Sequence, residues 1–569
     1  MIRVIAFVAV GLLLHSGAAM KVSAATVERS SGSADGTPPQ TELINEQLRT
    51  GWADQQLAPC KDAPDGAWCR RVYLDLVGRI PTVSELQTYL KDRKSGKRRR
   101  LVDRLLGDEY LEEYATHWTT VWTNVLIGRT GGTAQDSMAS RPGMQQYLRR
   151  SFQKNKPYDR LAMELITATG SCQPGDEDFN GAANFLADKM AENGVQATAR
   201  TAQIFLGTAV QCTQCHNHPF NEWKQNQFWE LNAFFRQTGV ERIASDTNRR
   251  GLARVVDRDF AGEGGDPAKA EIYYELRNGK LKVAYPVFVD GTSLAAKYAE
   301  KGEDFGDSGY LANVNRRQEL AQFVIGSPQF GPAIVNRMWS HFLGYGFTKP
   351  IDDMGPHNAA SHPELMDRLA EEFKNSSYNL RELQRWIVLS DAYALDSRMT
   401  KQNEKDDPAL GTRPMFSHFY LRQMQAEQLY ESLLTATGAA DALSYDQREQ
   451  VKQRWLEQFN TAFGNDENGE ATTFNGSIPQ ALMMMNGELI RKATSTESGS
   501  FLARIAGDAK LDNAEKINYL YLAALARQPE RDELALSNQL LAAREGNVGA
   551  ALQDIWWALL NSNEFILNH

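Results

Sequence analysis

The clearest chemical pattern in this sequence is a pair of cysteines followed at once by a histidine. Cys212 and Cys215 are separated by two residues, and His216 comes next. Two thiols at this spacing can each add to a vinyl group of one porphyrin, and the adjoining imidazole then lies under the iron as an axial ligand. With 5 Cys and 9 His in 569 residues, a chance match is on the order of one in a thousand. The segment therefore predicts one covalent haem c.

Other chemistry stays open for the same segment. His218 lies two residues after His216, so two thiolates and two imidazoles are available for a tetrahedral zinc ion, which is the alternative cofactor. Such crowding is unusual, because zinc ligands normally come in two separated pairs. A plain disulfide or a redox-active pair is the third possibility, although the surrounding sequence is helical and lacks the βαβ context of redox motifs.

Aromatic residues are dense in the twenty positions after the histidine. Haem needs an apolar pocket that excludes water and sets its potential, and these side chains would suit one. Ordinary helix core explains them equally well. The residues concerned are Pro219, Phe220, Trp223, Phe228, Trp229, Phe234 and Phe235.

His362 is the histidine best placed to supply a second metal ligand. Ser361 and Glu364 have the spacing of a capping box, with Pro363 in the first turn, so we expect His362 at the start of a helix. The positive end of a helix disfavours protonation, and a metal binds the neutral imidazole. A structural role for His362, as a cap or hydrogen-bonding group, is the alternative. The weaker candidates are His341 and His357.

The remaining cysteines and one pair of aspartates complete the candidate residues. Cys60 and Cys69 lie nine positions apart in a loop rich in Pro, Asp and Gly, and a disulfide there would contribute roughly 2–3 kcal/mol in an exported protein. Cys172 is left over, and we expect a small buried hydrophobe. Asp352 and Asp353 could bind a cation or supply acid–base chemistry, although a turn is the simpler explanation.

The N-terminus predicts export. Residues 1–25 combine an early arginine, a short apolar run and small residues, which is typical of a signal peptide, and residues 26–45 are expected to form a flexible tether. No later segment has the roughly 20 apolar residues of a membrane span. The net charge of -9 argues against nucleic-acid binding. We therefore expect a periplasmic or extracellular protein without a membrane span in the mature chain.

The elements that must position these residues are mainly helical. Apolar residues recur at three- and four-residue spacing through most of the chain, and helical spacing before residue 209 runs directly into the first cysteine. Residues 272–276 and 281–285, joined by a turn with Asn278 and Gly279, predict one β-hairpin. We expect a mainly α fold of two helical domains, at 46–295 and 312–569, with the hairpin closing the first. There is no repeat of fixed period.

A resemblance supports this division. The chain resembles the secreted planctomycete cytochrome-like proteins, which pair two domains of unknown function. The first domain's pattern is matched at 70–76, 78–82, 183–185, 205–207 and 211–220, and the second domain's at 335–339, 352–353, 361–365, 425–428, 481–482, 486 and 560–565. The resemblance implies the two-domain architecture and a haem-attachment segment at Cys212, Cys215 and His216, but no established activity.

Together these observations predict an exported c-type haem protein for electron transfer or small-molecule redox chemistry. Cys212 and Cys215 would attach the haem, and His216 would be the proximal ligand. The protein would then exchange electrons with a redox partner protein. The alternative is a secreted scaffold or interaction protein without haem, in which Cys212 and Cys215 form a zinc or disulfide clip. No nucleophile elbow, P-loop or dinucleotide fingerprint is present that would name an enzyme.

Overall fold

The computed structural model describes residues 36–134, 136–243, 253–258, 271–299, 314–439, 449–452, 455–456 and 487–569, with residues 264, 266, 269 and 485 singly. The predicted signal peptide and the first half of the predicted tether, residues 26–35, lie outside these ranges. Residues 39–45, which we expected in the tether, form the beginning of the first helix, α1 (Pro39–Asp54). Pro39 at its first position suits a helix start, because the missing N–H has no partner to lose there.

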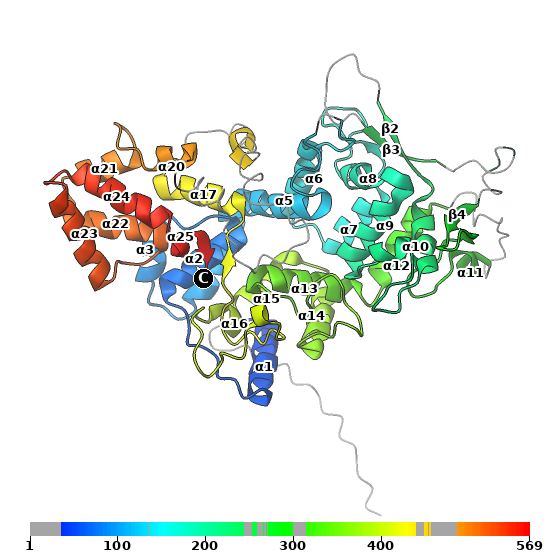
Figure 1. Cartoon of the computed structure of the whole chain (residues 1–569), viewed down its shortest axis with the longest axis horizontal. Coiled ribbons are helices and arrows are strands. Elements are labelled where there is room, and N and C mark those ends of the chain that lie inside the picture. The colour runs from blue at the N-terminus through cyan, green and yellow to red at the C-terminus, as the bar shows by residue number, and fades with distance from the viewer. Residues whose placement is uncertain are drawn as a thin grey trace, which may run out of the picture.

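Helices dominate the described residues, as the apolar spacing predicts (Figure 1). Those up to residue 299 are α2 (Asp65–Val77), α3 (Val83–Lys91), α4 (Lys97–Leu105), α5 (Leu111–Ile127), α6 (Arg141–Gln153), α7 (Tyr158–Thr167), α8 (Ala183–Lys189), α9 (Ala191–Leu206), α10 (Gln225–Asn232) and α11 (Leu294–Ala299), with the 3₁₀ turns η1 (Asp108–Tyr110), η2 (Gln211–Gln214) and η3 (Ala233–Phe235).

The described residues after 313 are also mainly helical. Their elements are α12 (Arg316–Gly326), α13 (Phe330–Leu343), α14 (Pro363–Asn375), α15 (Leu380–Val388), α16 (Asp391–Ala394), the 3₁₀ turn η6 (Pro408–Leu410), α17 (Ala426–Thr437), α20 (Glu488–Ala493), α21 (Phe501–Gly507), α22 (Asn513–Leu525), α23 (Arg531–Ala543), α24 (Val548–Leu560) and α25 (Asn563–Ile566).

The predicted β-hairpin is confirmed. Strands β4 (Ile272–Glu275) and β5 (Leu281–Ala284) pair antiparallel with Tyr273 opposite Val283, and Gly279 in the connecting turn has a φ of 79°. Two further small sheets were not predicted. In one, β1 (Gly170–Ser171) and β2 (Thr238–Arg242) flank β3 (Ala253–Asp257), and in the other β6 (Arg422–Gln423) pairs with β7 (Leu567–Asn568). The fold is therefore mainly α with small antiparallel sheets.

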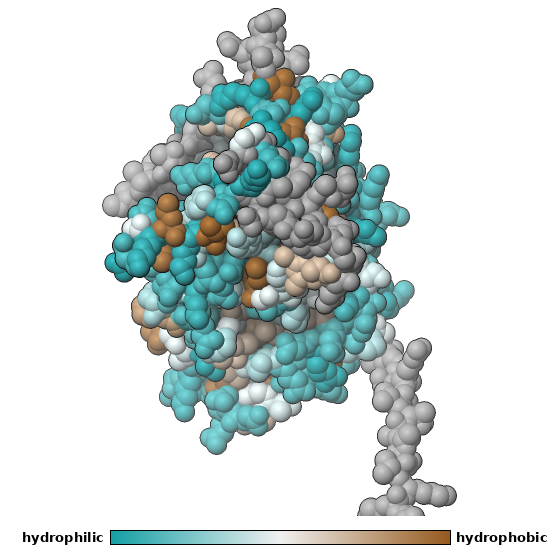
Figure 2. Space-filling view, turned by 90° about the vertical axis from the view of Figure 1, so that its right-hand side faces the viewer, coloured by the Kyte–Doolittle hydropathy of each residue, from teal (hydrophilic) through white to brown (hydrophobic). Residues whose placement is uncertain are grey.

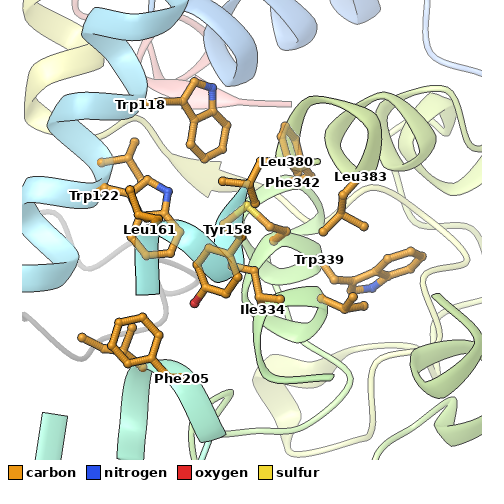
Figure 3. Close-up of a cluster of buried hydrophobic side chains, with 14 of the residues drawn as sticks. Trp118, Trp122, Tyr158, Leu161, Phe205, Ile334, Trp339, Phe342, Leu380 and Leu383 are labelled. Atoms are coloured by element: carbon orange, nitrogen blue, oxygen red, sulfur yellow. The ribbon is translucent and has the colours of Figure 1, made fainter. Parts of the chain in front are cut away.

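One apolar core joins helices from both halves of the chain. Trp118 of α5 lies 6.0 Å from Phe342 of α13 between ring centroids (Figure 3). Tyr158 of α7 stacks on Phe330 at 5.2 Å between ring centroids. Each fully buried aromatic ring contributes about 2–3 kcal/mol relative to an exposed one. The predicted boundary near 295–312 therefore does not separate two apolar cores, because residues from both sides of it pack in this one core.

Helix α2 carries two buried arginines that bind backbone far away in the sequence. Arg70 donates to the carbonyls of Phe565 and Leu567 at 2.6 and 3.0 Å. Arg71, which is fully buried, donates to Leu395 at 3.1 Å and also to the carbonyl of Tyr393. Figure 1 shows the result, with α2 and α3 lying among the C-terminal helices. A buried guanidinium needs several acceptors, and backbone carbonyls supply them here.

Asp75, one turn further along α2, completes this buried network. Its carboxylate is inaccessible to solvent and pairs with Arg422 at 2.5 Å. It also accepts hydrogen bonds from the Tyr393 hydroxyl at 2.7 Å and the Asn568 amide at 2.9 Å. The three partners come from three separate segments of the second half, so Asp75 fixes all of them against α2.

One local pattern occurs twice, at the turns after α2 and α22. Arg79 binds Glu85 and Glu113, and Arg527 likewise binds Glu533 and Glu564. Each arginine is followed two residues later by a proline and six residues later by the glutamate that caps the next helix. The two modules lie side by side through contacts between α3 and α22. The sequence has no fixed period, but it does carry this paired turn.

We expect Asp75→Ala to lower the free energy of unfolding by about 3–5 kcal/mol, because it leaves Arg422 buried without its carboxylate. Chemical denaturation followed by circular dichroism measures this loss. Asp554→Ala is the matched control, since Asp554 pairs with Arg544 at the surface, where an ion pair contributes under about 1 kcal/mol. Equal stability of the two variants would contradict a central role for Asp75.

Candidate functional site

The cysteine motif lies on a short exposed turn. Helix α9 ends at Leu206, and Cys212 and Cys215 follow in and just after η2, both exposed and free. The expectation that a helix runs directly into the first cysteine is therefore wrong. The physical reason is Gly207, whose left-handed φ of 61° ends α9.

Gly207 also ties the motif to the second half of the chain. The backbone N–H of Met354 donates to the Gly207 carbonyl at 2.7 Å. A Cβ placed on Gly207 would lie 2.7 Å from the Met354 sulfur, so a larger residue would displace that side chain and would also be strained by the left-handed φ. The turn that carries the cysteines thus begins at a contact between the two halves of the molecule.

Side chains of α10 hold the other end of the turn. The indole of Trp229 and the amide of Gln225 both donate to the Gln214 carbonyl, at 3.1 and 3.2 Å. Gln225 also donates to the Glu275 carbonyl of β4 at 2.8 Å, which links the β-hairpin to the motif. Inside the turn, the Thr213 hydroxyl is buried and donates to Val210 at 2.6 Å. The turn is therefore braced on both sides while its thiols face solvent.

The ring of His216 is oriented by the next residue. Its Nδ1 lies 2.7 Å from the Asn217 carbonyl oxygen. A carbonyl only accepts hydrogen bonds, so Nδ1 carries the proton and Nε2 of the neutral ring keeps its lone pair. Backbone orientation of a histidine through the nitrogen opposite the metal is the usual arrangement in metal ligation. His216 is thus in the tautomer that an axial ligand needs.

His218 does not complement His216 as a zinc ligand. Its Nδ1 accepts hydrogen bonds from the backbone N–H groups of Phe220 and Asn221, at 3.2 and 3.1 Å. Nε2 of the neutral ring then carries the proton, so neither nitrogen offers a lone pair to a metal. Within the described ranges, no three His, Cys, Asp or Glu residues are gathered in a way that could hold a metal ion. The four-ligand zinc arrangement is not formed.

The aromatic residues after the motif divide into two groups. Phe228, Phe234 and Phe235 are almost completely buried and belong to the core, as the alternative explanation predicts. Phe220 is 85% exposed, and Tyr273 and Leu281 of the β-hairpin are more than half exposed. Figure 2 turns this side of the molecule to the viewer and shows separate hydrophobic patches on a mainly hydrophilic surface. The motif therefore lies near apolar surface, not in a deep pocket.

His362 is buried, and none of its contacts is with the cysteine motif. It is the N-cap of α14, and Ser361 bonds its Nδ1 at 3.0 Å without forming the predicted capping box. Its Nε2 has no hydrogen-bond partner and lies against Gly51 of α1. Burial lowers the pKa of His362 to about 4, so the ring is neutral. The structure does not bring it to Cys212 or Cys215 through any contact, and a packing role accounts for it.

The predicted Cys60–Cys69 disulfide is not formed. Both cysteines are buried free thiols. The Cys60 sulfur donates to the Arg398 carbonyl at 2.9 Å and accepts from the Asn403 amide at 3.1 Å, whereas Cys69 packs inside the core on α2, where burial raises its pKa. The loop prediction failed because Cys69 belongs to a helix. Cys172 is fully buried, as expected for a small hydrophobe.

Asp352 and Asp353 lie in a turn, as the simpler explanation predicts. Asp352 accepts a hydrogen bond from Gln203 of α9 and lies 4.0 Å from Arg337. Asp353 pairs with His357 at 3.0 Å. The contact between Asp352 and Gln203 ties the second half of the chain to α9, just before the cysteine motif.

A cavity of about 450 Å³, which sequence reasoning missed, lies where α2, α5 and α17 meet. Its walls include His117, Glu427 and Lys452, which are each at least nine-tenths buried. Residues this far apart in the sequence carry no local signal. One hint to the cavity was present in the sequence, because Glu427 lies in the segment 425–428, where the chain resembles the pattern of the second domain.

Comparison with known proteins gives two matches to family models. Residues 43–240 match a model described as "Protein of unknown function (DUF1549)", and residues 316–468 match one described as "Protein of unknown function (DUF1553)". The two matches agree with the predicted two-domain organisation of the sequence. No curated protein and no solved structure matches. No helix among the described residues is long and apolar enough to cross a membrane.

The haem-free protein should show two classes of thiol under reducing-agent-free, anaerobic conditions. We expect two thiols per chain, Cys212 and Cys215, to react rapidly with a thiol reagent, and three to react only after unfolding. Solvent access controls this difference because the thiolate must meet the reagent. The double variant Cys212→Ala/Cys215→Ala should lose the rapid class. Failure to recover three further thiols in denaturant would restore the Cys60–Cys69 disulfide.

His362 should make stability depend on pH. Its pKa falls from 6.5 in the unfolded chain to about 4 in the folded one, so the unfolded state binds the extra proton, and stability falls as the pH drops from about 6.5 toward 4. Between pH 7.5 and 5 we expect the parent protein to lose about 2 kcal/mol more than His362→Gln. Denaturant titrations at both pH values measure this. Parallel losses in the two proteins would mean that His362 has the same pKa in the folded and unfolded chains.

Proposed function

We propose that this protein is an exported c-type haem protein in which Cys212 and Cys215 attach one haem and His216 is the proximal ligand. The observation that carries the proposal is the geometry of this segment. Both thiols are free and exposed on a braced turn, and Nε2 of His216 keeps its lone pair because Nδ1 is bound by Asn217. These are the requirements for two thioether bonds and one axial bond.

The residues present fit a haem better than the zinc alternative. Zinc would need four donors that converge, and His218 directs its Nδ1 to the backbone of its own turn. Haem takes two thiols and one imidazole from this segment, and these three groups are contiguous in the sequence. Phe220 and the exposed face of the β-hairpin offer apolar surface close to the turn.

Electron transfer is the reaction that this arrangement supports best. A haem supplies a one-electron couple, and its potential depends on the axial ligands and on exposure to solvent. The chain contributes an exposed attachment turn, which a redox partner protein could approach closely. Activation of a small molecule would instead need an enclosed distal pocket, and the motif lies at the surface. His362 is not proposed as the second ligand, because its ring packs against Gly51.

Absorption and mass spectra test the proposal. We expect the full chain, exported in a host with haem-attachment machinery, to show a Soret band and an intact mass increased by one haem. Cys212→Ala/Cys215→Ala should lose both features, and His216→Ala should alter the spectrum while the mass increment remains, because the imidazole binds iron and the thiols bind the porphyrin.

Cys172→Ala is the matched control, since Cys172 is fully buried and distant from the motif in sequence. This variant should retain both the Soret band and the mass increment. A colourless protein, with or without bound zinc, would overturn the haem assignment and leave the scaffold function in its place.

A further inference from the structure

Gln225, the first residue of α10, makes hydrogen bonds on both sides of Cys215 and His216. The residue is only 5% exposed. Its amide nitrogen donates to the Gln214 carbonyl at 3.2 Å and to the Glu275 carbonyl of β4 at 2.8 Å. A carbonyl only accepts hydrogen bonds, so the NH₂ group faces both partners and uses both of its protons. One buried side chain therefore joins the cysteine turn to the β-hairpin.

The backbone of Gln225 holds the other side of the motif. Its N–H donates to the side-chain Oδ1 of Asn217 at 3.0 Å. The backbone carbonyl of the same Asn217 lies 2.7 Å from Nδ1 of His216 and orients that ring. The residue that orients the imidazole is thus itself bound to the start of α10.

Cys215 and His216 lie between these two anchors, since Gln214 precedes them and Asn217 follows them. We call the bonds of Gln225 to Gln214, Asn217 and Glu275 the clamp. Two residues between fixed points keep few backbone conformations, so they lose little entropy when they engage a ligand. The cysteine–histidine pattern gives no sign of the clamp, because its central residue belongs to the next helix.

The β-hairpin supports the clamp through a second side chain of α10. Trp229, one turn after Gln225, donates its indole N–H to the same Gln214 carbonyl at 3.1 Å and stacks on Tyr274 of β4, with ring centroids 6.0 Å apart. Tyr274 is 6% exposed and packs in the small apolar cluster beneath the hairpin. Figure 1 shows α10 beside the strands of the hairpin. The hairpin therefore has a role at the cysteine turn.

We infer that Gln225 is a positioning residue that holds Cys215 and His216 in one conformation and His216 in the Nδ1–H tautomer. The purpose of the clamp rests on the haem proposed above, whereas the clamp itself is measurable without haem. In the haem-loaded chain, the hydrogen bond from Nδ1 makes the imidazole a stronger donor to iron and favours the ferric state.

Ring ¹⁵N chemical shifts of His216 in the haem-free full chain test the clamp, at about pH 9 where an ordinary imidazole is neutral. Asn217→Ala removes the acceptor for the Gln225 N–H. We expect the ratio of the Nδ1–H to the Nε2–H tautomer to fall roughly two- to tenfold, the range of one hydrogen bond. Asn217→Asp keeps an acceptor oxygen and should restore the ratio.

Asn547→Ala is the matched control, because Asn547 is also exposed and accepts a backbone N–H at the start of a helix, α24. This variant should leave the tautomer ratio unchanged. Asn217 is exposed as well, so circular dichroism of Asn217→Ala should match that of the parent protein.

Gln225→Glu tests the amide in the haem-loaded chain. The carboxylate keeps the shape of the side chain but cannot donate to the two carbonyls. Gln227→Glu is its control, since it adds the same charge to α10 while its side chain still accepts from the Lys224 N–H. We expect Gln225→Glu to have the higher reduction potential, because a less firmly held imidazole is a weaker donor to iron.

The outcomes separate the clamp from the haem. A parent chain that takes up no haem contradicts the proposed function, whatever the tautomer ratio. An unchanged ratio in Asn217→Ala, or failure of Asn217→Asp to restore it, would overturn the inference whether or not haem is bound. Equal potentials of Gln225→Glu and Gln227→Glu would also overturn it.

Discussion

The buried charges of α2 are the constraint on which the rest of the structure depends. Arg70, Arg71 and Asp75 have left water, and burying such charges is costly unless they are paired and hydrogen-bonded. Their partners are carbonyls and side chains at 393–395, 422 and 565–568. One helix near the beginning of the chain thereby organises three segments of the second half, and the apolar core shared by both halves forms around that arrangement.

Local sequence signals predicted the parts of the fold that are locally determined. The hairpin at 272–284 follows from the strand-like residues on either side of Asn278 and Gly279. Long-range packing decided the rest. Cys69 was assigned to a loop but lies in α2. The local sequence gives only a weak helix signal there, and packing of the buried side chains stabilises the helix. Strands β6 and β7 pair Gln423 with Leu567, residues far apart in the sequence, and no local pattern marks them.

The candidate sites show the same division. Cys212, Cys215 and His216 are contiguous, so the sequence alone identified them, and the structure added the tautomer of His216 and the bracing by Trp229. His362 illustrates the opposite case, since a plausible helix-start histidine proved to pack on α1. The walls of the cavity come from distant segments, and His117, Glu427 and Lys452 come together only after folding. Chemistry that needs adjacent residues is visible in sequence, whereas chemistry that needs converging helices is not.

The paired turns at Arg79 and Arg527 have a consequence for the order of folding. In each turn the arginine, the proline and the capping glutamate lie within seven residues, so most of their bonds close short loops with little entropy loss. Such modules can form early and independently near opposite ends of the chain. Docking of α3 on α22 then brings these two nuclei together by slow, long-range closure of the chain between them. We therefore expect the rate-limiting step to be the meeting of preformed ends.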